Sequence, residues 1–112
     1  METTIREARD WTTIVVFGAV DSASSPVLEA ECRGRIEAGV RRLAIDLTEV
    51  FYMSSAGLRV LLSTLKLMAK QNGRLVLVGP HSNVKHVLDM SGFGRIFSIV
   101  AAVEQLPAGD SE

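Results

Sequence analysis

Two adjacent serines, Ser54 and Ser55, stand where side-chain chemistry is possible. They separate an apolar run ending at Met53 from a second one beginning at Leu58, in the stretch DLTEVFYMSSAGLRVLL. A serine that opens a helix can cap the unpaired backbone N–H groups of the first turn. Its hydroxyl can also accept phosphate, because the helix dipole favours negative charge at that end. The residues alone leave both roles open.

The helix that these serines open is predicted over residues 55–71. Leu58, Leu61 and Leu65 recur with helical spacing and are expected to face a sheet. Asn72-Gly73 suits the end of the helix.

A partner-binding surface is predicted on the other sides of this helix. Val60 and Leu67 project away from the predicted core side, with Thr64 between them and the core, and Arg59 belongs to a basic stripe. Single exposed apolar residues occur on any protein surface, but an apolar strip beside a basic one also suits a partner protein. Both interpretations stay open. The candidate partner-binding residues are Ser54, Ser55, Arg59, Val60, Thr64 and Leu67.

Strands and helices alternate along the chain. The predicted strands are 3–8, 12–20, 42–47, 75–79 and 97–100, and the predicted helices are 25–39, 55–71 and 82–91, with a last helical turn at 103–106. Arg9-Asp10 indicates a short hairpin connection between the first two strands. The order predicts an α/β fold with a mixed sheet, mainly parallel with an N-terminal antiparallel hairpin, and helices packed against it. We expect one domain over residues 1–112, with its core at about 3–106.

Composition excludes several classes of function. Twelve Lys+Arg against 13 Asp+Glu give a net charge of -1, so no general attraction to nucleic acid is expected. Cys32 is the single cysteine, which rules out an internal disulfide, and no zinc-type cluster is present. The apolar runs are shorter than the ~20 residues of a membrane helix, and the polar N-terminus is no signal peptide. We expect a cytoplasmic protein without metal, cofactor or membrane insertion.

A serine hydrolase is the enzymatic alternative. It would need a base near Ser55, and the histidines are His81 and His86. The surrounding MSSAG differs from the Gly-x-Ser-x-Gly elbow of such enzymes, so we expect no catalytic residues. Asp21 and Asp46, at strand ends, are interpreted as loop or turn caps in preference to ligand-binding groups.

The quoted stretch resembles the signature of STAS domains, the fold of bacterial anti-sigma factor antagonists. In that pattern a strand ending in Asp and a short apolar link lead to Asp-Ser-Ser-Gly-Leu, or a variant, at the start of a helix. GAVDSASSPVLEAECRGRI is similar to the family's strand exit and first helix, and GRLVLVGPHSNVKHVLDMSGFGRIFSIV to its fourth strand, third helix and last strand. The resemblance covers roughly residues 3–106.

This resemblance implies a partner switch. In the family, the unphosphorylated protein binds an anti-sigma factor that is also a serine kinase of the histidine-kinase-like ATPase class, which frees the sigma factor. Phosphorylation of the helix-opening serine breaks the complex, and a serine phosphatase restores it.

Matching Gly57-Leu58 to the family's Gly-Leu puts Ser55 at the phosphoacceptor position and Ser54 where the family usually has Asp. Three alternatives stay open: Ser55 is phosphorylated, Ser54 is phosphorylated, or neither is. STAS-like subunits also accompany lipid-transport ATPases or belong to larger signalling scaffolds. In that alternative Ser55 is only a helix cap.

Overall fold

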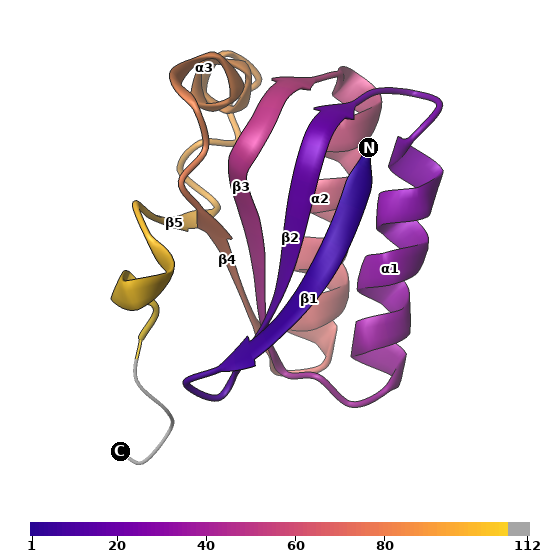
Figure 1. Ribbon diagram of the computed structural model, residues 1–112, viewed down its shortest axis with the longest axis vertical. Coiled ribbons are helices and arrows are strands. Elements are labelled where there is room, and N and C mark those ends of the chain that lie inside the picture. The colour runs from indigo at the N-terminus through magenta and orange to yellow at the C-terminus, as the bar shows by residue number, and fades with distance from the viewer. Residues whose placement is uncertain (108–112) are drawn as a thin grey trace.

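A five-stranded sheet with the strand order β1-β2-β3-β4-β5 forms the centre of the protein (Figure 1), and the computed structural model describes residues 1–107. The strands are β1 (Glu2–Ala8), β2 (Trp11–Val20), β3 (Arg42–Met53), β4 (Arg74–Val78) and β5 (Ser98–Val100). The helices are α1 (Ser25–Glu37), α2 (Ser55–Lys70) and α3 (Ser82–Met90), followed by a 3-10 turn (Val103–Gln105).

The β1–β2 pair is antiparallel, and every other pair in the sheet is parallel. The connection is the two-residue turn Arg9-Asp10, where both residues have positive φ, 58° and 68°. Positive φ at both central residues is typical of the tight turn whose twist matches a hairpin. The predicted mixed α/β fold with an N-terminal hairpin is therefore confirmed.

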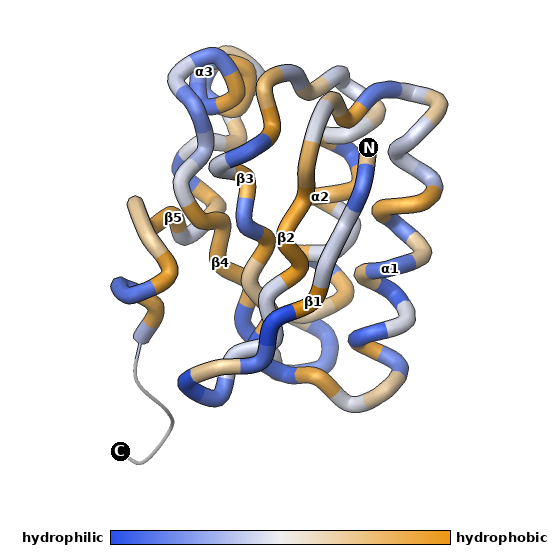
Figure 2. Tube along the Cα trace, viewed as in Figure 1, coloured by the Kyte–Doolittle hydropathy of each residue, from blue (hydrophilic) through white to orange (hydrophobic). Residues whose placement is uncertain are grey.

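The two faces of the sheet are covered differently. α1 and α2 pack side by side over one face, where Ile14, Ile45 and Leu61 belong to the main core. Figure 2 shows hydrophobic residues concentrated in the inner strands, while β1 is more hydrophilic. On the other face, Trp11 and Leu106 pack in a second cluster, and Trp11 Nε1 donates to the backbone oxygen of Pro107 at 2.8 Å. Residues 103–107 thus cover part of the face opposite the helices.

β3 is longer than predicted, because the stretch expected as a link after residue 47 continues as strand to Met53. Its pairing with β4 ends at Asp46, but its pairing with β2 continues to the pair Val20–Met53 through two irregularities in register. The predicted end was wrong because these irregularities keep β2 and β3 together beyond the regular alternation of buried and exposed residues. The last residues of β3 therefore extend beyond β4 and lead directly into α2.

Candidate functional site

The two serines at the start of α2 occupy different structural positions. Ser54 is the N-cap residue, with extended backbone (φ -84°, ψ 173°), and its Oγ accepts a hydrogen bond from the Gly57 backbone N–H at 3.3 Å. Ser55 is the first helical residue and is exposed. Within residues 1–107 no hydrogen bond holds the Ser55 hydroxyl. The sequence left capping and modification open for either serine. In the structure, Ser54 caps the helix and Ser55 has the exposed hydroxyl.

The start of α2 is fixed to the ends of β2 and β3. The Ser54 backbone N–H donates to the Val20 oxygen at 2.9 Å. Gly57 lies so close to these strands that a Cβ there would meet Val20 Cγ1 at 2.8 Å and Met53 Cγ at 3.0 Å. Glycine is needed for this close approach. Ser55 is therefore presented from a rigidly placed first turn.

A fixed negative charge lies in the loop that follows β2. Asp21 Oδ1 accepts hydrogen bonds from Ser24 N (2.9 Å), Ala23 N (3.1 Å) and Ser24 Oγ (3.0 Å). These hydrogen bonds, with the Ser24 backbone bond the largest cause, lower the pKa of Asp21. Asp21 directly follows Val20, the residue bonded to Ser54. It caps its own loop, as the sequence indicated, and brings an ionised carboxylate to this end of the protein.

Asp46 also serves as a local cap. Its Oδ1 accepts from Thr48 N at 3.0 Å and from Thr48 Oγ1 at 2.7 Å. This geometry agrees with the interpretation of a turn cap.

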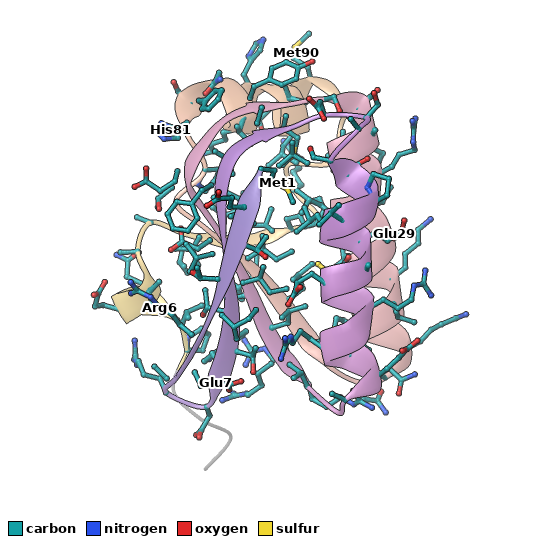
Figure 3. The ribbon with its side chains drawn as sticks, turned by 45° about the vertical axis from the view of Figure 1, so that its right-hand side comes forward. Met1, Arg6, Glu7, Glu29, His81 and Met90 are labelled. Carbon is teal, nitrogen blue, oxygen red and sulfur yellow. The ribbon has the colours of Figure 1, made fainter. Side chains whose placement is uncertain are left out.

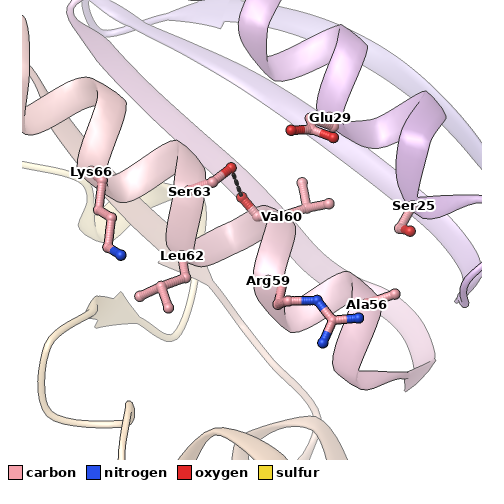
Figure 4. A pocket seen from close by; sticks show the side chains of 8 residues that line it. All are labelled: Ser25, Glu29, Ala56, Arg59, Val60, Leu62, Ser63 and Lys66. Atoms are coloured by element: carbon pink, nitrogen blue, oxygen red, sulfur yellow. Dashed lines mark hydrogen bonds between the residues drawn. The ribbon is translucent and has the colours of Figure 1, made fainter.

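An open groove of about 510 Å³ runs between α1 and α2 and extends to Ala56, the residue after Ser55 (Figure 4). Figure 4 shows Arg59 beside Ala56 at one end of the groove and Lys66 at the other, with Glu29 on α1 facing α2. The full lining consists of Ser25, Glu29, Ala56, Arg59, Val60, Leu62, Ser63 and Lys66. The α2 side of this groove is therefore cationic and continues the surface on which Ser55 lies.

Two of the predicted partner-binding residues are not on the surface. Val60 is 6% exposed and Thr64 3% exposed, while Leu67 is half-buried and packs against the main core. The predicted exposure of Val60 and the predicted partner contact of Thr64 were wrong because α2 packs on α1 as well as on the sheet. The outward side of α2 is instead polar and carries Ser55, Arg59, Ser63 and Lys66.

The buried contact between α1 and α2 includes Cys32 and Thr64. Burial raises the pKa of the Cys32 thiol to about 11, and a hydrogen bond with the Thr64 side chain opposes that shift. The thiol is 1% exposed and therefore belongs to the packing between the helices.

Three exposed apolar residues at one end of the molecule, Phe51, Tyr52 and Met90, were not predicted from the sequence and are here called the apolar tip. These side chains are 63%, 50% and 74% exposed. Asn83 Nδ2 of α3 donates to the Phe51 oxygen at 2.5 Å, and Met90 follows on the same face of α3, two turns later, at its outer end (Figure 3). The apolar tip therefore belongs to the end of the molecule where β3 leads into Ser54. The usable signal was the unbroken run from Val50 to Met53, which is too long for an alternating strand that buries all its apolar residues.

Neither histidine forms a catalytic pair with Ser55. His81 Nε2 lies 2.6 Å from the Thr48 oxygen, and His86 is an exposed residue of α3. Among the residues that the structure describes, no group of His, Cys, Asp and Glu side chains is arranged to hold a metal ion. In the same part of the chain, no helix has the length and apolar character to cross a membrane.

Comparison with known proteins gives consistent matches. A family model described as "STAS domain" matches residues 2–106. BtrV of Bordetella bronchiseptica, a candidate anti-sigma factor antagonist, is 40% identical over 91 residues, covering 81% of this chain and 78% of that protein. The anti-sigma-B factor antagonist of Bacillus subtilis is 35% identical over 89 residues, covering 80% and 81%. The Bacillus protein SpoIIAA, solved in its phosphorylated form, has the same fold, with a TM-score of 0.72 at 20% identity, covering 92% of this chain and 95% of that one.

Proposed function

Because the chain belongs to the STAS domain family, we propose that it is an anti-sigma factor antagonist whose binding is controlled at Ser55. In keeping with this family and with relatives named as antagonists, the chain is a non-catalytic binding protein. Unmodified, it binds an anti-sigma factor and so frees a sigma factor. Phosphorylated on Ser55, it releases that partner. The observation that carries the proposal is that Ser54 caps the helix, whereas the Ser55 hydroxyl is exposed and makes no hydrogen bond within residues 1–107.

The fold is suited to survive this modification. A phosphate adds about -1.5 to -2 charges at pH 7, and the first turn of a helix stabilises negative charge. Arg59 lies one turn further along the same exposed side of α2. The cap of the helix is made by Ser54, so modification of Ser55 leaves the capping hydrogen bond in place. Phosphorylation would then change the surface without unfolding α2.

The proposed partner is an anti-sigma factor that is itself a serine kinase of the histidine-kinase-like ATPase class, with a serine phosphatase to reverse the reaction. The solved phosphorylated form of SpoIIAA supports phosphorylation as a property of a similarly folded protein. The proposed contact surface combines Ser54, Ser55 and Arg59 with the apolar tip, while Leu67 lies at its margin. Val60 and Thr64, being buried, act through the packing of α2 on α1.

The test compares Ser55→Ala and Ser55→Asp with a matched control, Ser63→Asp. Ser63 is an exposed serine on the same side of α2, so its replacement adds the same charge two turns away. With the purified anti-sigma factor of the source organism, calorimetry should show wild-type, Ser55→Ala and Ser63→Asp binding, and at least a tenfold weaker Kd for Ser55→Asp.

A kinase assay with the same anti-sigma factor and ATP, followed by mass spectrometry, identifies the modified residue. Phosphate on Ser55, lost in Ser55→Ala, is the expected result. Phosphate on Ser54, or equal binding by all four proteins, would refute the assignment of Ser55 as the switch. Binding to a transport ATPase in place of an anti-sigma factor would refute the proposed function itself.

A further inference from the structure

β1 forms an open edge of the sheet. It pairs with β2 along its whole length and has no neighbour on its other side among the described residues, as Figures 1 and 3 show. Alternate residues of an edge strand point their backbone N–H and C=O groups outward, ready to pair with another strand. We propose that β1 pairs antiparallel with β1 of a second copy, so that Glu2 and Arg6 of each copy form two symmetric ion pairs.

The register follows from backbone geometry. An antiparallel pair forms when outward-pointing residues of one strand face outward-pointing residues of the other. Because the direction of the backbone groups alternates along β1, odd-numbered residues of one copy must face odd-numbered residues of the other, and even-numbered residues must face even-numbered ones. The register centred on Thr4 puts Thr4 opposite its own copy and Glu2 opposite Arg6 on both sides of the two-fold axis. The register centred on Ile5 would instead put Glu2 opposite Ala8 and Thr3 opposite Glu7, without any ion pair.

The side chains in the Thr4-centred register lie on one face of the sheet. Glu2 pairs with Phe17 of β2 and Arg6 with Thr13, so both side chains point away from the face that carries Ile5 and Ile14 and is covered by the helices. Both are exposed, and neither makes an ion pair within residues 1–107. Opposite charges directly across an antiparallel pair stabilise it, and like charges there destabilise it.

Charges on an edge strand usually prevent pairing. Here their signs and spacing do the opposite, because a positive and a negative residue stand at equal distances from Thr4. A strand pair of this length gives a small interface, so the dimer is expected to be reversible, with a Kd on the order of 100 μM. α2 packs over β3 and β4, away from this edge, so each dimer presents two Ser55 residues. The inference is independent of the proposed function.

The test measures the chain alone by sedimentation equilibrium at protein concentrations from about 10 μM to about 1 mM, a range that spans the expected Kd. Wild type should show a monomer–dimer equilibrium that weakens at high salt. Glu2→Arg and Arg6→Glu should each weaken dimerisation at least about fivefold, because each turns two attractive pairs into two repulsive ones. An equimolar mixture of these two variants should dimerise again, because Arg at position 2 then meets Glu at position 6, and the reverse.

Lys70→Glu is the control, since it changes the charge by the same amount on α2 and should leave dimerisation unchanged. Circular dichroism verifies that every variant is folded. A wild type that remains monomeric at 1 mM overturns the proposal and leaves the β1 edge for a strand of another protein. A dimer that is insensitive to both charge reversals, or a mixture no more dimeric than its components, also overturns it.

Discussion

Replacing each of the adjacent serines by alanine should have unequal effects on stability. Ser54→Ala removes the side-chain acceptor from the Gly57 N–H, and loss of an N-cap typically costs about 1 kcal/mol. Since this hydrogen bond is long, 3.3 Å, we expect the lower half of the range, about 0.5–1 kcal/mol. Ser55→Ala should change the free energy of unfolding by less than about 0.5 kcal/mol, because Ser55 is exposed and alanine is the better helix former.

Urea unfolding followed by the fluorescence of Trp11 measures this difference, because Trp11 is the single tryptophan and is buried. The corresponding drop in Tm for Ser54→Ala is roughly 2–5 °C. Ser54→Asp is the matched control. Aspartate caps as well as serine does, so it should remain within about 0.5 kcal/mol of wild type. A loss for Ser55→Ala equal to that for Ser54→Ala would refute the division of roles between the two serines.

Two further predictions concern stability. Gly34→Ala should stabilise the protein by up to about 1 kcal/mol, because Gly34 is an exposed residue inside α1 with open space at its Cβ position. Gly79→Ala should destabilise the protein by at least about 2 kcal/mol, because Gly79 has a φ of +59° and its Cβ would lie 2.2 Å from Thr48 Cγ2. Thermal unfolding monitored by circular dichroism measures both changes. The raised pKa of the Cys32 thiol, about 11, predicts a stability contribution that is complete below the unfolded-state value of about 8.5 and is lost as the pH rises towards 11, at about 1.4 kcal/mol per pH unit. Urea unfolding measured at a series of pH values from about 8 to about 10.5 should show this fall in the free energy of unfolding in wild type and not in Cys32→Ala. Equal slopes in the two proteins would show that Cys32 is not the cause.

Elements specified by local sequence were predicted well. α2 was expected over residues 55–71 and spans Ser55–Lys70, because helical spacing, a serine at the start and Asn72-Gly73 at the end all act within a few residues. The hairpin at Arg9-Asp10 was likewise predicted from the polar pair between two β-rich stretches. Such signals do not depend on where other elements lie.

The errors concern contacts between distant parts of the chain. The exposure expected for Val60 and the partner contact expected for Thr64 assumed that α2 has one buried side, whereas its position against α1 buries a second one. The length of β3 depends on its irregular pairing with β2, and the end of β3 is bonded to α3 through Asn83 and the backbone oxygen of Phe51. None of these arrangements leaves a periodic pattern in the sequence of the element itself.

The arrangement around Ser55 indicates where the energy of the proposed switch must arise. Changing a complex from 99:1 bound to 1:99 requires about 5.5 kcal/mol. Within the protein itself, a phosphate on Ser55 meets the N-terminus of α2 and has Arg59 one turn away, so its cost to the fold is small. The Asp21 carboxylate, which follows the Val20 that bonds to Ser54, and the apolar tip at this end of the molecule carry no positive charge. A partner that covers this end of the molecule would remove water from the phosphate, and this desolvation falls on the complex alone. The proposed switch therefore acts by making the complex unfavourable while leaving the STAS fold intact.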